Sequence, residues 1–157
     1  TNLRQSTLML ITAITIHNIP EGMAVGLAFS LAMSDPTEPA LFSGAAALSL
    51  GIGIQNYPEG TAVALPLSKD GMGRKKSFFL GSMSAVVEPV FGVIAAIIAS
   101  FVTPLMPLLL SFAAGTMIYV VVQELLPEAQ ACDDGKTATL GFIAGFLIMM
   151  ILDVSLG

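Results

Sequence analysis

The chain has 157 residues, of which 55% are hydrophobic and 11% are charged, with no tryptophan and a formal net charge of −5 at pH 7. Its mean hydropathy of +0.86 is too high for a domain that hides its apolar residues in one core, which excludes an ordinary soluble protein. The acidic balance also lacks the basic footprint of a nucleic-acid-binding protein, so no nucleic acid partner is expected.

Apolar runs long enough to cross a bilayer as helices, which takes about 20 residues, occur five times along the chain. They cover residues 6–33, 40–67, 77–102, 104–127 and 138–156. No stretch remains for a soluble domain, so the predicted fold class is all-α, a polytopic transmembrane helical bundle that forms a single domain over 1–157. The chain begins with Thr1 and no charged leader precedes the first run, so we expect a fragment or processed piece without a signal peptide.

The first two predicted helices carry one motif. "HNIPEG", from His17 to Gly22, matches "QNYPEG", from Gln55 to Gly60, at an offset of 38 residues. Consecutive membrane helices run in opposite directions, so we expect the two motifs to meet antiparallel at similar depth, as in transporters built on inverted halves. The third helix repeats the theme in shorter form, with Glu88 before a proline.

Prolines in these motifs predict local breaks in the helices. A proline has no N–H to give to the carbonyl four residues earlier, so each helix is expected to kink and to leave that carbonyl free. The pairs of proline and freed carbonyl are Pro20 with Ile16, Pro58 with Ile54, and Pro89 with Ala85. Such carbonyls at membrane depth have to face protein, water or an ion.

The polar side chains of the motifs form a candidate metal site. Residues four apart share one face of a helix, which pairs His17 with Glu21 and Gln55 with Glu59. The complete candidate set is His17, Asn18, Glu21, Gln55, Asn56, Glu59 and Glu88. Imidazole, carboxylate and amide oxygen suit Zn²⁺, Fe²⁺, Mn²⁺ or Cd²⁺, whereas the absence of a thiolate argues against Cu⁺. No organic cofactor is expected.

Charge supports a cation at this position. The glutamates Glu21, Glu59 and Glu88 carry a formal −3 between them, which one divalent cation reduces to −1 and two change to +1. Either occupancy lowers the cost of charge inside a membrane. Because metal binding requires deprotonated ligands, we expect metal and protons to compete for the site.

Polar residues elsewhere leave alternatives open. Gln123 and Glu124 lie near the end of the fourth predicted helix, where Glu124 is either an exit-path ligand or a carboxylate that reaches interfacial water. Asp153, near the end of the last helix, is either an entrance ligand or solvated. Cys132 is the single cysteine, so neither a disulfide nor a cysteine metal cluster can form within the chain.

The basic residues predict the orientation. All of them lie before the first helix or in the second and fourth loops: Arg4, Lys69, Arg74, Lys75, Lys76 and Lys136. Cytoplasmic loops carry an excess of lysine and arginine, so the N-terminus is expected in the cytoplasm and the C-terminus outside.

"HNIPEG" and "QNYPEG", followed by "VVEPVFG" on the next helix, resemble the ZIP (Zrt-, Irt-like protein) family of metal transporters and, within it, the GufA-like and ZupT-like bacterial branch. The family has eight transmembrane helices, so the resemblance implies helices four to eight of that fold, with the N-terminal three missing. It also implies a binuclear site. One metal position matches His17, Gln55 and Glu59; the second matches Asn18, Glu21, Asn56, Glu59 and Glu88. Asn56 stands where relatives carry Asp, and Gln123 where His is frequent.

The resemblance implies a function as well. This is transport of a divalent transition metal into the cytoplasm, zinc first and iron, manganese or cadmium as further candidates, by an elevator-like shift of the helices that carry the site. The expected location is a bacterial inner (plasma) membrane. The expected partners are metal ions, the lipid bilayer, the missing helices and a second copy of the protein in a homodimer.

Two functions other than transport make different demands on the sequence. An intramembrane metalloprotease needs H-E-x-x-H, but Asn18 and Glu21 occupy the positions of its glutamate and second histidine, and the chain has one histidine. An enzyme is therefore not expected. A membrane metal sensor that binds without transporting stays open on sequence alone.

Overall fold

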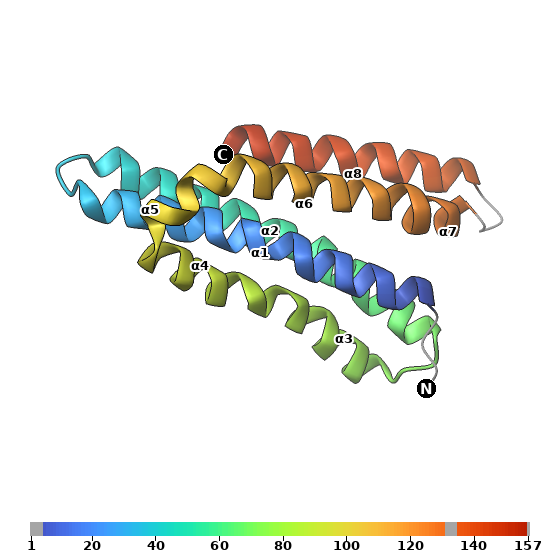
Figure 1. Ribbon diagram of the computed structural model, residues 1–157. Helices are drawn as coiled ribbons and strands as arrows, with labels where there is room; N and C mark the ends of the chain where they lie inside the picture. Colours follow the sequence, from blue (N-terminus) through green and yellow to red (C-terminus); the bar gives the residue numbers. More distant parts are fainter. Residues whose placement is uncertain (1–4, 131–134, 157) are drawn as a thin grey trace.

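The computed structural model describes residues 5–130 and 135–156, all of the elements in which are helical (Figure 1). α1 (Gln5–Ser34) and α2 (Pro39–Lys69) are the two long helices and lie antiparallel to each other. α1 is central, because it packs against α2, α4 and α6, while α2 also contacts α3 and α8. The fold is a helical membrane bundle, as the composition predicts.

α1 and α2 each run as one continuous helix past Pro20 and Pro58. Neither proline ends its helix, and the predicted bounds of 6–33 and 40–67 are met within two residues at each end. The end of α2 is defined by the backbone N–H of Asp70, which donates to the carbonyls of Pro66 and Ser68. Gly71, with φ of 90°, then turns the chain toward the third helix.

The third predicted helix is divided in front of its proline. It consists of α3 (Arg74–Met83), a 3₁₀ turn labelled η1 (Ser84–Val86) and α4 (Val87–Ile97). Pro89 cannot donate to the carbonyl of Ala85, and the tighter turn lies at that point. The interruption predicted beside Glu88 is therefore present as a change of helix type.

The boundary predicted between the third and fourth helices is wrong. The chain leaves the helix at Ile98, and α5 (Ala99–Val102) and the 3₁₀ turn η2 (Thr103–Leu105) lead directly into α6 (Met106–Val120). Pro104 and Pro107 look like loop signals in the sequence, but they lie in the first turns of helical segments, where a missing N–H costs nothing.

The end of the fourth predicted helix also changes type. A π-helical segment labelled η3 (Val121–Leu125) joins α6 to α7 (Leu126–Gln130). Pro127 has no N–H for the carbonyl of Gln123, which explains why the regular hydrogen bonding is interrupted here. α8 (Gly135–Leu156) follows and contacts α2 and α7.

Glycines bring the helices that carry the motifs into backbone contact. A Cβ on Gly26 of α1 would lie 2.6 Å from the carbonyl carbon and 2.8 Å from the Cα of Gly92 in α4. One turn earlier, a Cβ on Gly22 would meet the backbone of Glu88 itself. Only glycine allows this approach, so the small residues of α1 fix where α4 and its glutamate lie.

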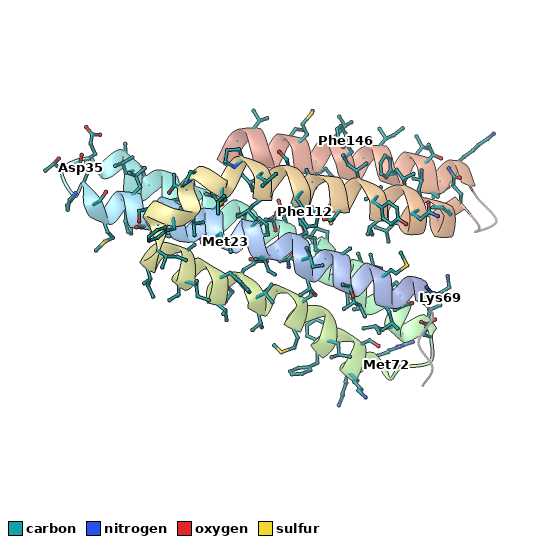
Figure 2. The ribbon with its side chains drawn as sticks, in the orientation of Figure 1. Met23, Asp35, Lys69, Met72, Phe112 and Phe146 are labelled. Carbon is teal, nitrogen blue, oxygen red and sulfur yellow. The ribbon has the colours of Figure 1, made fainter. Side chains whose placement is uncertain are left out.

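Large apolar side chains cover the outside of the bundle, as drawn in Figure 2. Phe146 of α8, for example, is 61% exposed, and Ile97 of α4 is 77% exposed. Among the described residues, three helices are long and apolar enough to cross a membrane: Thr7–Ser34, Arg74–Ile97 and Ala99–Gln123. α2 is long enough to cross a membrane but is less apolar than these three helices, because its centre is polar. In α8, the described apolar part is Lys136–Ile151, which is shorter than the three spans. Spanning by α2 and α8 stays a prediction.

Candidate metal centre

The two copies of the repeated motif face each other in the middle of the bundle. α1 supplies His17, Asn18 and Glu21, and α2 supplies Gln55, Asn56 and Glu59. The amide Nε2 of Gln55 donates to Oε1 of Glu21, which joins the two motifs directly. The two motifs therefore meet, as predicted, and their depth in the membrane stays a prediction.

Three side chains converge as a candidate metal-binding cluster. One ligand atom from each of His17, Glu21 and Glu59 lies within 4.8 Å of the other two. Within α1, Nε2 of His17 is 3.2 Å from Oε1 of Glu21, one helical turn away, and the two side chains are only 15% and 12% exposed. An imidazole and two carboxylates in one partly buried space have the composition of a divalent metal site.

The imidazole of His17 is oriented by a helix outside the motifs. Its Nδ1 lies 3.2 Å from the carbonyl oxygen of Ala113 in α6. A carbonyl can only accept, so Nδ1 carries the hydrogen of this bond. Nε2 is then directed at the carboxylate cluster, and in a neutral imidazole of this tautomer it is the nitrogen whose lone pair can bind a metal. Histidines that bind metals are typically held by this kind of second hydrogen bond, which fixes the tautomer and the ring plane.

Asn18 and Asn56 extend the cluster toward the third helix. Asn56 Nδ2 donates to Oε2 of Glu88 over 2.7 Å, and Asn18, which is fully buried, donates from Nδ2 to the carbonyl of Ser84 over 3.3 Å. The 3₁₀ turn in front of Glu88 therefore holds Asn18, while Asn56 holds Glu88. The seven predicted site residues therefore lie in one region of the bundle. Glu21 contacts His17 and Gln55, with Glu59 in the same cluster, while Asn56 contacts Glu88 and Asn18 contacts the turn in front of Glu88.

Several oxygen atoms of this group have no hydrogen-bond donor. Among the described residues, the buried side-chain atoms without a partner are Asn18 Oδ1, Glu21 Oε2, Asn56 Oδ1, Glu59 Oε2 and Glu88 Oε1. Each belongs to a repeated motif or to Glu88. A buried acceptor without a partner costs about 1–3 kcal/mol, and five together are a large penalty for one small region. Cations satisfy such oxygens, so the donor set fits metal ions.

A cavity of about 460 Å³ reaches the group from one side. Its walls come from the parts of α1, α2 and α4 nearest the α1–α2 loop, which is marked by Asp35 in Figure 2. Glu88 is the one charged residue among those that line it, beside Ser49, glycines and apolar side chains. The carboxylate of Glu88 therefore lies where this cavity meets the polar group.

The other predicted site residues lie away from the cluster or outside the described part. Gln123 is exposed in η3, at the opposite end of α6 from α5. The side chains of Glu124 and Asp153, and residue Cys132, lie outside the described residues. Sequence reasoning missed the carbonyls of Ala113 and Ser84, because every residue has a carbonyl and nothing in the sequence marks these two.

The bundle and this buried group define a membrane protein with a candidate metal centre, and the chain belongs to the ZIP zinc transporter family, whose model matches residues 1–153. It is 52% identical to zinc transporter ZIP11 of Xenopus tropicalis over 150 residues, which are 96% of this chain and 44% of that protein. Human zinc transporter ZIP11 is 48% identical over 149 residues, 95% of this chain and 43% of its own length. Zinc transporter GufA of Myxococcus xanthus is 38% identical over 152 residues, 97% of this chain and 57% of its own length.

The chain thus spans about half the length of these curated relatives. No solved structure matches it.

Proposed function

We propose that the full-length protein moves divalent transition metal ions, zinc first among them, across a membrane and into the cytoplasm. The observation that carries this proposal is the convergence of His17, Glu21 and Glu59 within 4.8 Å inside a helical membrane bundle. Family membership and the printed names of the relatives, all zinc transporters, support zinc as the cargo. Iron, manganese and cadmium share the same ligand preferences.

Two neighbouring metal positions account for the whole group. The first uses His17, Gln55 and Glu59, and the second uses Asn18, Glu21, Asn56, Glu59 and Glu88, with the glutamates available as bridges. The oxygens without donors support the second position, because three of them belong to Asn18, Asn56 and Glu88, outside the three-residue cluster. Gln55 now donates to a carboxylate, and rotation of its amide by half a turn presents its oxygen to a metal. Asn56 donates to Glu88 through its nitrogen, and its oxygen has no donor as it stands.

The route and the setting form part of the same proposal. We infer that the N-terminus of the chain is cytoplasmic and that the cavity beside Glu88 lies toward the outside. Asp153 is then the entrance ligand, Gln123 and Glu124 form the exit, and three further helices and a second copy complete the assembly. The proposed membrane is a bacterial inner (plasma) membrane. The helices that carry the site shift against the others to release the ion.

Uptake of radioactive zinc by vesicles that contain the full-length protein tests transport. The variant Glu59→Ala removes the carboxylate shared by both proposed positions, and we expect it to lose nearly all uptake. Glu38→Ala is the matched control, because Glu38 is exposed between α1 and α2 and makes no side-chain capping bond. Equal uptake by the wild type and Glu59→Ala contradicts the proposal. A wild type that binds zinc tightly but takes up none favours a metal sensor instead.

A further inference from the structure

Three consecutive basic residues begin the third helix of the bundle. Arg74, Lys75 and Lys76 form the first turn of α3 and are all exposed. This basic cluster contains half of the six basic residues in the chain. The first turn has no acidic residue, and the N-cap residue Gly73 offers no side-chain hydrogen bond. A helix N-terminus carries partial positive charge, so cations are unfavourable there without an anionic partner.

The described residues supply no such partner. Within the part of the chain that the structure describes, the side chains of Arg74, Lys75 and Lys76 take part in no ion pair or hydrogen bond. Three like charges on adjacent residues, added to the positive end of the helix, repel one another. An external anion with several oxygen acceptors relieves this repulsion, because lysine and arginine form charge-assisted hydrogen bonds to phosphate.

The position of the cluster selects the kind of anion. Arg74 is the first residue of an apolar segment, Arg74–Ile97, that is long enough to cross a membrane. Its basic end therefore lies at the level of the lipid headgroups. Phe78 and Phe79 follow directly and are 69% and 59% exposed. Exposed aromatic rings next to basic residues are typical of surfaces that enter the boundary between headgroups and acyl chains.

We propose that the basic cluster of Arg74, Lys75 and Lys76 binds the headgroups of anionic phospholipids, with Phe78 and Phe79 in the adjoining acyl region. Juxtamembrane basic residues of this kind attract anionic leaflets, and the attraction grows with each added charge. The orientation rule for membrane proteins explains why basic residues gather at this end of the helix. That rule alone does not explain why three basic side chains in one helical turn, next to two exposed aromatic rings, have no partner among the described residues.

This surface is connected to the candidate metal centre. Gly81 of α3 packs against Gly60 of α2, where a Cβ on Gly60 would lie 3.3 Å from the Gly81 carbonyl oxygen, and Gly60 follows Glu59 in the chain. α3 then continues into the turn whose Ser84 carbonyl holds Asn18. A lipid bound at the start of α3 anchors the helix that supports both residues. Lipid binding itself does not depend on whether the protein transports metal.

Native mass spectrometry of the full-length protein in detergent tests the proposal, with phosphatidylglycerol as the anionic probe and phosphatidylcholine as the neutral one. We expect the wild type to prefer phosphatidylglycerol. Neutralising the cluster (Arg74→Gln, Lys75→Gln and Lys76→Gln together) removes this preference, at about fivefold in affinity for each charge. Exchanging the basic types (Arg74→Lys, Lys75→Arg, Lys76→Arg) keeps it. Lys136→Gln, which removes an exposed lysine at the start of α8, is the matched control and keeps it too.

Three results overturn the proposal. The first is an unchanged preference in the neutralised variant, and the second is an equal loss in Lys136→Gln, which indicates a simple effect of net charge. The third is displacement of phosphatidylglycerol by millimolar inorganic phosphate, which indicates a site for free anions. Thermal melting checks that the neutralised variant is folded. If it is not, the single variant Lys75→Gln carries the test with its expected fivefold loss.

Discussion

The contact between Gly26 and Gly92 gives the sharpest test of how the bundle builds the candidate metal centre. In Gly26→Ala the new Cβ starts 2.6 Å from the carbonyl carbon of Gly92, whereas carbon atoms pack at about 3.5–4.0 Å. The obstacle is backbone, so α1 and α4 have to separate by about an ångström at this level. Metal–ligand distances tolerate a deviation of only about 0.2 Å. Glu88, one turn along α4, is then too far away to share a metal with the residues of α1.

We therefore expect Gly26→Ala to cost about 1–3 kcal/mol of stability from overpacking and to weaken zinc binding by about tenfold or more, which corresponds to about 1.4 kcal/mol. Titration calorimetry on the full-length protein measures the binding, and radioactive zinc uptake measures its consequence. Gly53→Ala is the matched control, because Gly53 of α2 lines the same cavity and a Cβ there meets nothing within 4 Å. Wild-type affinity in Gly26→Ala, or an equal loss in Gly53→Ala, refutes the reasoning.

Three further predictions follow from the contacts in the centre. Asn56→Asp puts a second carboxylate where the amide now donates to Glu88 over 2.7 Å. Zinc affinity measured by calorimetry should therefore rise at pH 8, and an unchanged affinity contradicts a metal position between residues 56 and 88. Zinc affinity of the wild type should fall as the pH is lowered from about 8 to 5, because protonated carboxylates and imidazolium do not bind metal; a flat profile excludes competition with protons. Asn18→Ala removes both the bond to the Ser84 carbonyl and a buried oxygen that has no hydrogen-bond donor. It should lower zinc affinity by about tenfold while costing about 1–3 kcal/mol of stability. The control is Ser77→Ala, which removes a buried polar side chain away from the centre and should leave zinc affinity unchanged. A similar loss of affinity in Asn18→Ala and Ser77→Ala assigns the effect to folding alone.

The sequence by itself determined the class of the protein and the residues of the candidate centre. Composition and the length of the apolar runs predicted a helical membrane bundle. Lipid offers the backbone no hydrogen-bond partners, and a helix satisfies all of its backbone hydrogen bonds within one segment. The repeat of "HNIPEG" and "QNYPEG" predicted that His17, Glu21 and Glu59 come together. That inference was possible because antiparallel neighbours with a shared motif have few ways to pack.

Only the tertiary structure decided how these residues are held. The Ala113 carbonyl that orients His17 and the Ser84 carbonyl that holds Asn18 are backbone groups 96 and 66 residues away in sequence, and no side-chain pattern reveals such partners. The turn at Ile98 was missed because no glycine, proline or charged residue marks it in the sequence. The conspicuous Pro104 and Pro107, by contrast, lie in the first turns of helices. Local sequence thus selects the helices and their polar residues. Close packing between helices, as at Gly26 and Gly92, sets the distances on which a metal centre depends.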